Sequence, residues 1–113
     1  MDEAGPTPDA DPVLVREFHA AMARIYTRAK SEAGYNATRY LQMVSEMGGL
    51  ATASHLLHAP GVSDGFTHLW ERGRLDLTVE ALVLQPDWRG LFTSGEVGIA
   101  RDRLTSYGYE VEA

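Results

Sequence analysis

Glycine and proline residues divide this chain into short segments, and that division constrains the fold more than any other feature. The stops are Gly34, Gly48–Gly49, Pro60–Gly61, Gly73, Pro86 and Gly108. Between them, apolar residues recur three and four positions apart, which is typical of amphipathic helices. Glycine is favoured just after a helix, and proline cannot continue one. The sequence therefore predicts an all-α fold: one compact domain of five to six short helices.

The first segment has the clearest helical pattern. Asp11 is a favourable N-cap, and Pro12 suits the first helical position. We expect a helix from here to Gly34 with an apolar face formed by Leu14, Phe18, Ala21, Met22, Ile25 and Ala29. At about 100° per residue, the opposite face carries the basic residues Arg16, Arg24, Arg28 and Lys30.

Two short helices are predicted before Pro60. Asn36 or Thr38 is expected to cap the first of them, whose apolar face consists of Tyr40, Leu41, Val44 and Met47. The next runs from Leu50 to His58 and buries Leu50, Ala53, Leu56 and Leu57. The Gly48–Gly49 pair separates the two helices.

A fourth helix is predicted to begin at the N-cap Ser63 and to end at Gly73. Its inward residues are expected to be Phe66, Leu69 and Trp70. A buried tryptophan needs a hydrogen-bond acceptor, and Asp76 or Glu80 could serve Trp70.

Residues 75–84 fit two patterns. Apolar residues alternate here as in a strand, but no other segment offers a second strand, and a lone strand leaves its backbone unpaired. We therefore predict a buried helix that starts at Asp76 or Thr78 and ends before Pro86. After a turn, residues 93–96 have the Thr-x-x-Glu spacing of a capping box, which predicts a last helix to about Ser106.

The ends of the chain differ from its body. Residues 1–10 are acidic and proline-rich with little to bury, so we predict a disordered arm, then a helical domain over 11–109 and an acidic tail over 110–113. The chain has no cysteine, no apolar run of about 20 residues and no signal-peptide pattern. These features predict a cytoplasmic protein that does not enter a membrane.

The net charge of -6 comes from the ends, because six of the 16 acidic residues lie there and the remaining ten balance the ten Lys and Arg residues. A broad basic surface for nucleic acid is therefore not expected. A single basic strip is expected instead, formed by Arg16, Arg24, Arg28 and Lys30 and extended by Arg39. It could bind phosphate or an acidic partner, or it could be an ordinary solvated helix face.

Three histidines raise the question of a metal site. His55 and His58 stand three apart on one predicted helix, and His68 and Glu71 repeat this spacing on the next. The alternative is that they are ordinary, partly exposed histidines, and neither a metal nor another cofactor is predicted. A helix-turn-helix reading of residues 51–72 is also open, but Asp64 would then face the DNA backbone.

Several stretches resemble a run found in small bacterial proteins of unassigned function, some of them linked to larger restriction or defence proteins. The resemblance covers residues 35–109 and rests on Thr38–Val44, Gly48–Gly49, Ser63–Phe66, Leu69–Glu71 and Gly73–Ala81. It implies a compact accessory module and no catalytic residue.

No catalytic signature is present: serines lack nucleophile-elbow glycines, and there is no glycine-rich phosphate loop. We therefore expect a non-enzymatic interaction module that docks on a protein partner or on itself. The alternative is a nucleic-acid accessory domain that binds phosphates through the basic face of its first helix.

Overall fold

The computed structural model describes residues 11–111, and over that range the chain is all-helical with no strand. The elements in chain order are α1 (Pro12–Ala33), α2 (Thr38–Met47), α3 (Gly49–His58), α4 (Asp64–Glu71), η1 (Leu75–Leu77), α5 (Val79–Val83), η2 (Pro86–Trp88) and α6 (Ser94–Ser106), where η marks a 3-10 turn. The all-α prediction is confirmed. The predicted arm 1–10 and the last two residues of the predicted tail lie outside the described residues.

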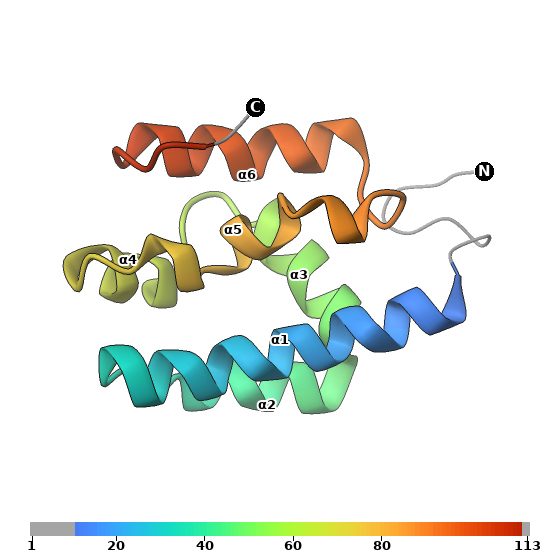
Figure 1. Cartoon of the computed structure of the whole chain (residues 1–113), viewed down its shortest axis with the longest axis horizontal. Coiled ribbons are helices and arrows are strands. Elements are labelled where there is room, and N and C mark those ends of the chain that lie inside the picture. Colours follow the sequence, from blue (N-terminus) through green and yellow to red (C-terminus); the bar gives the residue numbers. More distant parts are fainter. Residues whose placement is uncertain (1–10, 112–113) are drawn as a thin grey trace.

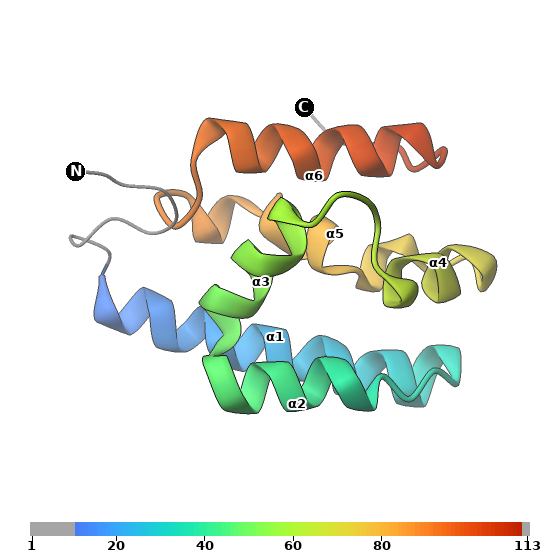
Figure 2. The ribbon, with the colours of Figure 1, turned by 180° about the vertical axis from the view of Figure 1, so that it is seen from behind.

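The helices stack in three tiers (Figures 1 and 2). α1 and α2 lie side by side and antiparallel at one end, and α6 lies at the other. α3 and α5 fill the middle, where both contact α1 and α6. α4 extends sideways from the middle tier and packs against η1. The short central helices lie between the outer tiers, and the main core cluster takes residues from α1, α2, α3, α5 and α6.

The ends of α1 are those that the sequence predicted. Asp11 Oδ1 accepts a hydrogen bond from Val13 N at 2.9 Å. Gly34 ends the helix in a left-handed conformation with φ 67°. Both ends of the longest helix are therefore set by local chemistry.

The predicted cap of α2 was wrong. The N-cap position belongs to Ala37, which offers no side-chain hydrogen bond, and Thr38 is the first helical residue. Asn36 is used elsewhere, since its Oδ1 accepts a hydrogen bond from Tyr26 Oη at 2.6 Å. The predicted apolar face of α2 is also only partly buried, because Val44 is buried whereas Met47 is 45% exposed.

The fifth helix is confirmed as a helix that ends before Pro86, and Thr78 rather than Asp76 starts it, since a separate 3-10 turn precedes it. The backbone of Thr78 is extended (ψ 160°), which separates the 3-10 turn Leu75–Leu77 from α5. Thr78 Oγ1 accepts from Ala81 N at 3.1 Å, so this threonine acts as the N-cap of α5. The cap competes with continuation of the preceding turn and breaks the helix there.

The core gathers around Phe18, whose ring packs edge-on against Trp88 and Phe92 with centroids 5.3 Å away in each case. The prediction that Trp70 faces inward was wrong, since its side chain is 45% exposed and meets the ring edge of Tyr107. Phe66 and Leu69 alone fill the buried face of the short α4. The two acceptors suggested for Trp70, Asp76 and Glu80, bind arginines instead.

The capping box at the start of α6 is confirmed. Thr93 Oγ1 accepts from Glu96 N at 3.1 Å, and Glu96 Oε1 accepts from Thr93 N at 2.9 Å. Glu96 is also buried, with 1% of its surface exposed, which the motif alone does not require.

Candidate functional site

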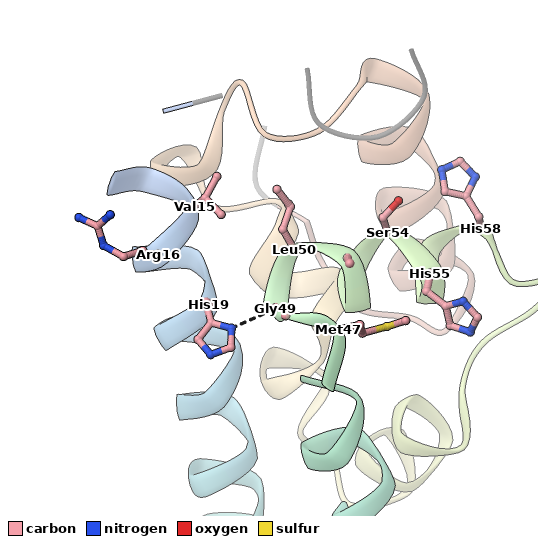
Figure 3. A pocket seen from close by; sticks show the side chains of 11 residues that line it. Val15, Arg16, His19, Met47, Gly49, Leu50, Ser54, His55 and His58 are labelled. Carbon is pink, nitrogen blue, oxygen red and sulfur yellow. Dashed lines mark hydrogen bonds between the residues drawn. The ribbon is translucent and has the colours of Figure 1, made fainter. Parts of the chain in front are cut away.

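An open groove lies between the first half of α1 and the corner where α2 meets α3 (Figure 3). It encloses about 920 Å³. Its apolar lining comes mainly from Val15, Met47, Leu50 and Ala51, and its polar lining from Arg16, His19, Ser54, His55 and His58.

Two glycines bring α3 against α1 and so create the groove. Gly48 takes a left-handed conformation (φ 89°), which turns the chain sharply between α2 and α3. A Cβ atom on Gly49 would lie 2.7 Å from the backbone Cα of His19, so only glycine permits this approach. The pair predicted only as a stop is therefore also a packing contact.

His19 fastens the same corner with its side chain. Its Nδ1 accepts a hydrogen bond from Gly49 N at 2.9 Å (Figure 3). The first N–H groups of a helix lack intrahelical partners, and a side chain usually supplies one from the N-cap residue. Here the N-cap is Gly48, which has no side chain, and a residue from α1 supplies the acceptor.

The polar side chains that line the groove are one arginine, three histidines and one serine, and no Asp or Glu is among them. A carboxylate does lie behind it: Glu96 Oε2 contacts His58 Nε2 at 2.8 Å and Ser54 Oγ at 3.4 Å. Glu96 is buried, so the groove presents an apolar floor and a cationic or polar rim to solvent.

Ser54, His58 and Glu96 do not form a catalytic relay. In such a relay the imidazole bridges the hydroxyl and the acid, with one ring nitrogen bonded to each. Here the hydroxyl and the imidazole both bind the same carboxylate oxygen. The other oxygen of Glu96 completes the capping box, so the contacts join α3 to α6.

The histidines considered for a metal site lie apart. His68, on α4, stacks on Tyr35 with ring centroids 4.7 Å apart, and its Nδ1 is 3.9 Å from Glu71. Within residues 11–111, no three side chains of His, Asp or Glu gather as metal ligands. His55 and His58 instead line the groove.

The structure divides the predicted basic strip. Arg16 lines the groove, whereas Arg24 and Lys30 are exposed further along α1. Arg28 is held by Glu32 at 2.9 Å, and Arg39 lies at the start of α2, at the mouth of a separate cavity.

Glu32 links Arg28 to a second arginine. Its Oε1 accepts from Arg74 at 2.7 Å, and Arg74 also binds Asp76 at 3.0 Å. Hydrogen bonds from Arg28 and then Arg74 lower the pKa of Glu32 from 4.5 to about 2. The charge of Arg28 is therefore already balanced within the protein.

α3 and α4 do not pack as a helix-turn-helix pair. α4 packs mainly on η1 and has little contact with α3, and it extends away from α3 (Figure 2). The reading considered for residues 51–72 therefore lacks the close helix pair that such a motif needs.

Sequence reasoning missed the residues that make the groove. His19 and Ala51 had no assigned role, and Met47 was assigned only to the apolar face of its helix, because their meeting depends on how α3 crosses α1. The doubled glycine was the one available signal, since a single glycine is enough to end a helix.

Comparisons with protein-family models, curated proteins and solved structures found no match. The helical fold agrees with the small all-helical domain that the sequence resemblance implied, and no activity comes with it. No helix within residues 11–111 has the length and apolar character needed to cross a membrane.

Proposed function

We propose that this protein is a non-enzymatic interaction module that binds an acidic, amphipathic helical segment of a partner protein in the groove. The observation that supports it most is the composition of the groove: an apolar floor, a rim with basic and imidazole groups, and no carboxylate among its lining residues. The cytoplasmic location expected from the sequence belongs to the same proposal.

Helix-in-groove recognition needs an apolar channel that is open along its length. Met47 is 45% exposed, which leaves a flexible apolar side chain free to pack on a partner. Positive charge at the rim favours acidic partners and speeds their association more than it adds affinity. Arg16 supplies that charge at the α1 side, and His55 and His58 flank the α3 side.

Two synthetic peptides of about four helical turns provide the direct test. Both carry leucines at positions i, i+3, i+4 and i+7, and the other positions hold glutamate and alanine in one and lysine and alanine in the other. We expect the acidic peptide to bind at least about tenfold more tightly, a difference of about 1.4 kcal/mol. Its binding should shift the NMR resonances of Val15, Met47 and Ala51.

A matched pair of variants separates charge from shape. Ala51 is exposed on the groove floor, in the first turn of α3. Ala51→Glu should weaken the acidic peptide by about tenfold, whereas Ala51→Lys has similar bulk and should preserve its binding. Met47→Ser should weaken both peptides, because it removes apolar contact area.

Equal binding of the two peptides, or shifts confined to α4, would contradict the proposal. Self-association through the groove is a different outcome: light scattering would show a dimer that Met47→Ser converts to a monomer, and the acidic peptide would compete poorly. That result would replace the partner segment with a second copy of the chain.

Phosphate binding by α1 remains the second candidate, because Arg16, Arg24 and Lys30 are exposed and form no ion pair with another described residue. Such binding would lose affinity steeply with salt. Reversing Arg24 and Lys30 to Glu should abolish it, and unchanged affinity for a DNA or RNA probe would exclude it.

A further inference from the structure

A second cavity, of about 460 Å³, lies on the other side of α3. It is bounded by the second half of α1, the start of α2, the α3–α4 connection, α4 and the segment 77–80. Its exposed mouth is polar and is formed by Asn36, Thr38, Arg39 and Asp64, whereas its buried lining includes Ala29, Phe66, Leu69, Leu77, Val79 and Glu80.

Glu80 is the charged group at the buried end of this cavity, with 3% of its surface exposed. Its Oε2 accepts from Arg103 at 3.0 Å. Arg103 also donates to the backbone carbonyls of Leu56, Leu57 and Ala59, so α6 holds this arginine and the end of α3 together. The positive charge that balances Glu80 is thus part of the fold.

The carboxylate of Glu80 still has capacity to accept a hydrogen bond. Among the described residues, Arg103 binds one oxygen, and beyond it only the backbone N–H of Glu80 itself reaches the carboxylate. Burial raises the pKa of Glu80 despite these bonds, so the carboxylate is poorly solvated where it lies. A further donor at this place would be favourable.

Several other polar side chains around the cavity have partners of their own. Tyr40 Oη donates to the carbonyl of Met22 at 2.7 Å, and Tyr26 Oη donates to Asn36 at 2.6 Å. Thr78 Oγ1 donates to the carbonyl of Leu75 at 2.7 Å. The buried polar residues that line the cavity are Thr78 and Glu80, and the Thr78 hydroxyl is already engaged, which leaves Glu80 as the buried group suited to orient a ligand.

We infer that this cavity binds a small, mainly apolar ring compound that donates one hydrogen bond from an N–H or O–H group to the carboxylate of Glu80. The volume falls in the range of small-molecule sites, about 300–1,000 Å³. Aromatic side chains at Tyr40 and Phe66 suit the edge of a ring. Because Arg103 already balances the charge of Glu80, a neutral donor such as an indole, a phenol or an arylamine fits better than a cation.

Indole and 1-methylindole form a matched pair of probes, since they have nearly the same shape and only indole has an N–H donor. Titrated into the full chain, indole should shift the NMR resonances of Ile25, Leu56 and Val79. It should bind about tenfold more tightly than 1-methylindole, because only indole gains a hydrogen bond to a charged acceptor. The groove residues Val15 and Ala51 should not respond.

Glu80→Gln tests the acceptor. Its amide oxygen can still accept from Arg103, while its amide nitrogen replaces the second acceptor by a donor. Indole should then bind about tenfold more weakly and 1-methylindole about as before. Glu96→Gln is the control, because it changes a buried carboxylate that does not line the cavity and should leave both affinities unchanged.

Ala29→Leu gives an independent test if Glu80→Gln does not fold. Ala29 is buried in α1 and lines the cavity, so a larger side chain should occupy the space, leave the fold intact and abolish indole binding. Equal affinity for the two probes, shifts at the groove, or unchanged indole binding in the Ala29→Leu variant would each overturn the inference.

Discussion

The groove and the cavity lie on opposite sides of α3, and different contacts hold α3 in place on the two sides. On the groove side, the backbone of Gly49 packs closely against α1, and Gly49 N donates one hydrogen bond to His19. On the cavity side, Arg103 of α6 forms a buried ion pair with Glu80 of α5 and also donates to three backbone carbonyls at the end of α3. His55 lines both spaces.

The two spaces also differ in shape, because the groove is open and the cavity is partly enclosed. A groove with an apolar floor and an exposed Met47 suits a large partner, because such a partner would remove much apolar surface from water when it binds. A partly enclosed space with one buried acceptor suits a small molecule, because a hydrogen bond to a buried group has more effect than one at the surface. Variants on each side should therefore affect stability and binding separately.

The largest effect is expected on the cavity side, from Arg103→Ala. The change leaves the buried Glu80 without its partner and removes the donor to three carbonyls of α3. Breaking a buried pair in this way costs about 3–5 kcal/mol. Urea unfolding followed by circular dichroism would measure the loss. Arg101→Ala, an exposed arginine of the same helix, should stay within about 0.5 kcal/mol of the parent protein.

On the groove side, Gly49→Ala should destabilise the fold by about 1–3 kcal/mol, because the new Cβ would meet the His19 Cα at 2.7 Å. Gly98→Ala is the matched control. Gly98 lies within α6, and nothing stands within 4 Å of its Cβ position. Alanine is the better helix former, so this variant should gain about 0.5–1 kcal/mol. If both variants lose stability, the tight α1–α3 contact is not the cause.

His19→Ala should have a smaller effect, about 1 kcal/mol, which is the usual cost of losing a helix cap. It removes the acceptor from Gly49 N without changing any buried apolar contact in the main core cluster. Hydrogen exchange of the Gly49 amide should accelerate in the variant. An unchanged exchange rate would mean that the imidazole does not protect this amide.

The sequence predicted the fold where a feature depends on residues close together in the chain. The caps at Asp11, Ser63 and the Thr93–Glu96 box are such features, and the structure confirms them. The prediction for α2 failed because the Asn36 side chain has a competing partner ten residues away, the Tyr26 hydroxyl. Of the two starts predicted for the fifth helix, Thr78 is the observed one, because its side chain caps α5.

Neither the groove nor the cavity could be predicted, because both depend on contacts between residues that are distant in the sequence. His19 meets Gly49 across 30 residues, and Glu80 meets Arg103 across 23. Charged residues are usually exposed, so the sequence gave no sign that Glu96 is buried, and it offered Glu80 only as an acceptor for Trp70. The prediction for Trp70 failed for a related reason: the length of α4 and its lateral position leave the indole at the edge of the fold.

The smallest effect is expected at Glu32, which joins the end of α1 to η1 beside the cavity through exposed ion pairs with Arg28 and Arg74. Its pKa is lowered in the folded protein, from 4.5 to about 2, so its ionised form stabilises the fold above pH 4.5. This contribution to stability is lost as the pH falls from 4.5 to about 2, because the unfolded chain takes up the proton at a higher pH than the folded protein. Glu32→Gln should therefore lower the melting temperature slightly at neutral pH and flatten its decline between pH 4.5 and about 2, where the melting curves of the variant and the parent protein should converge.

Glu46→Gln is the control: it changes an exposed carboxylate whose partner is the uncharged amide of Gln42, and the pH dependence of its melting temperature should parallel that of the parent protein. If Glu32→Gln also parallels the parent, this bridge contributes nothing to closing the cavity side, and the Glu80–Arg103 pair alone distinguishes that side from the groove.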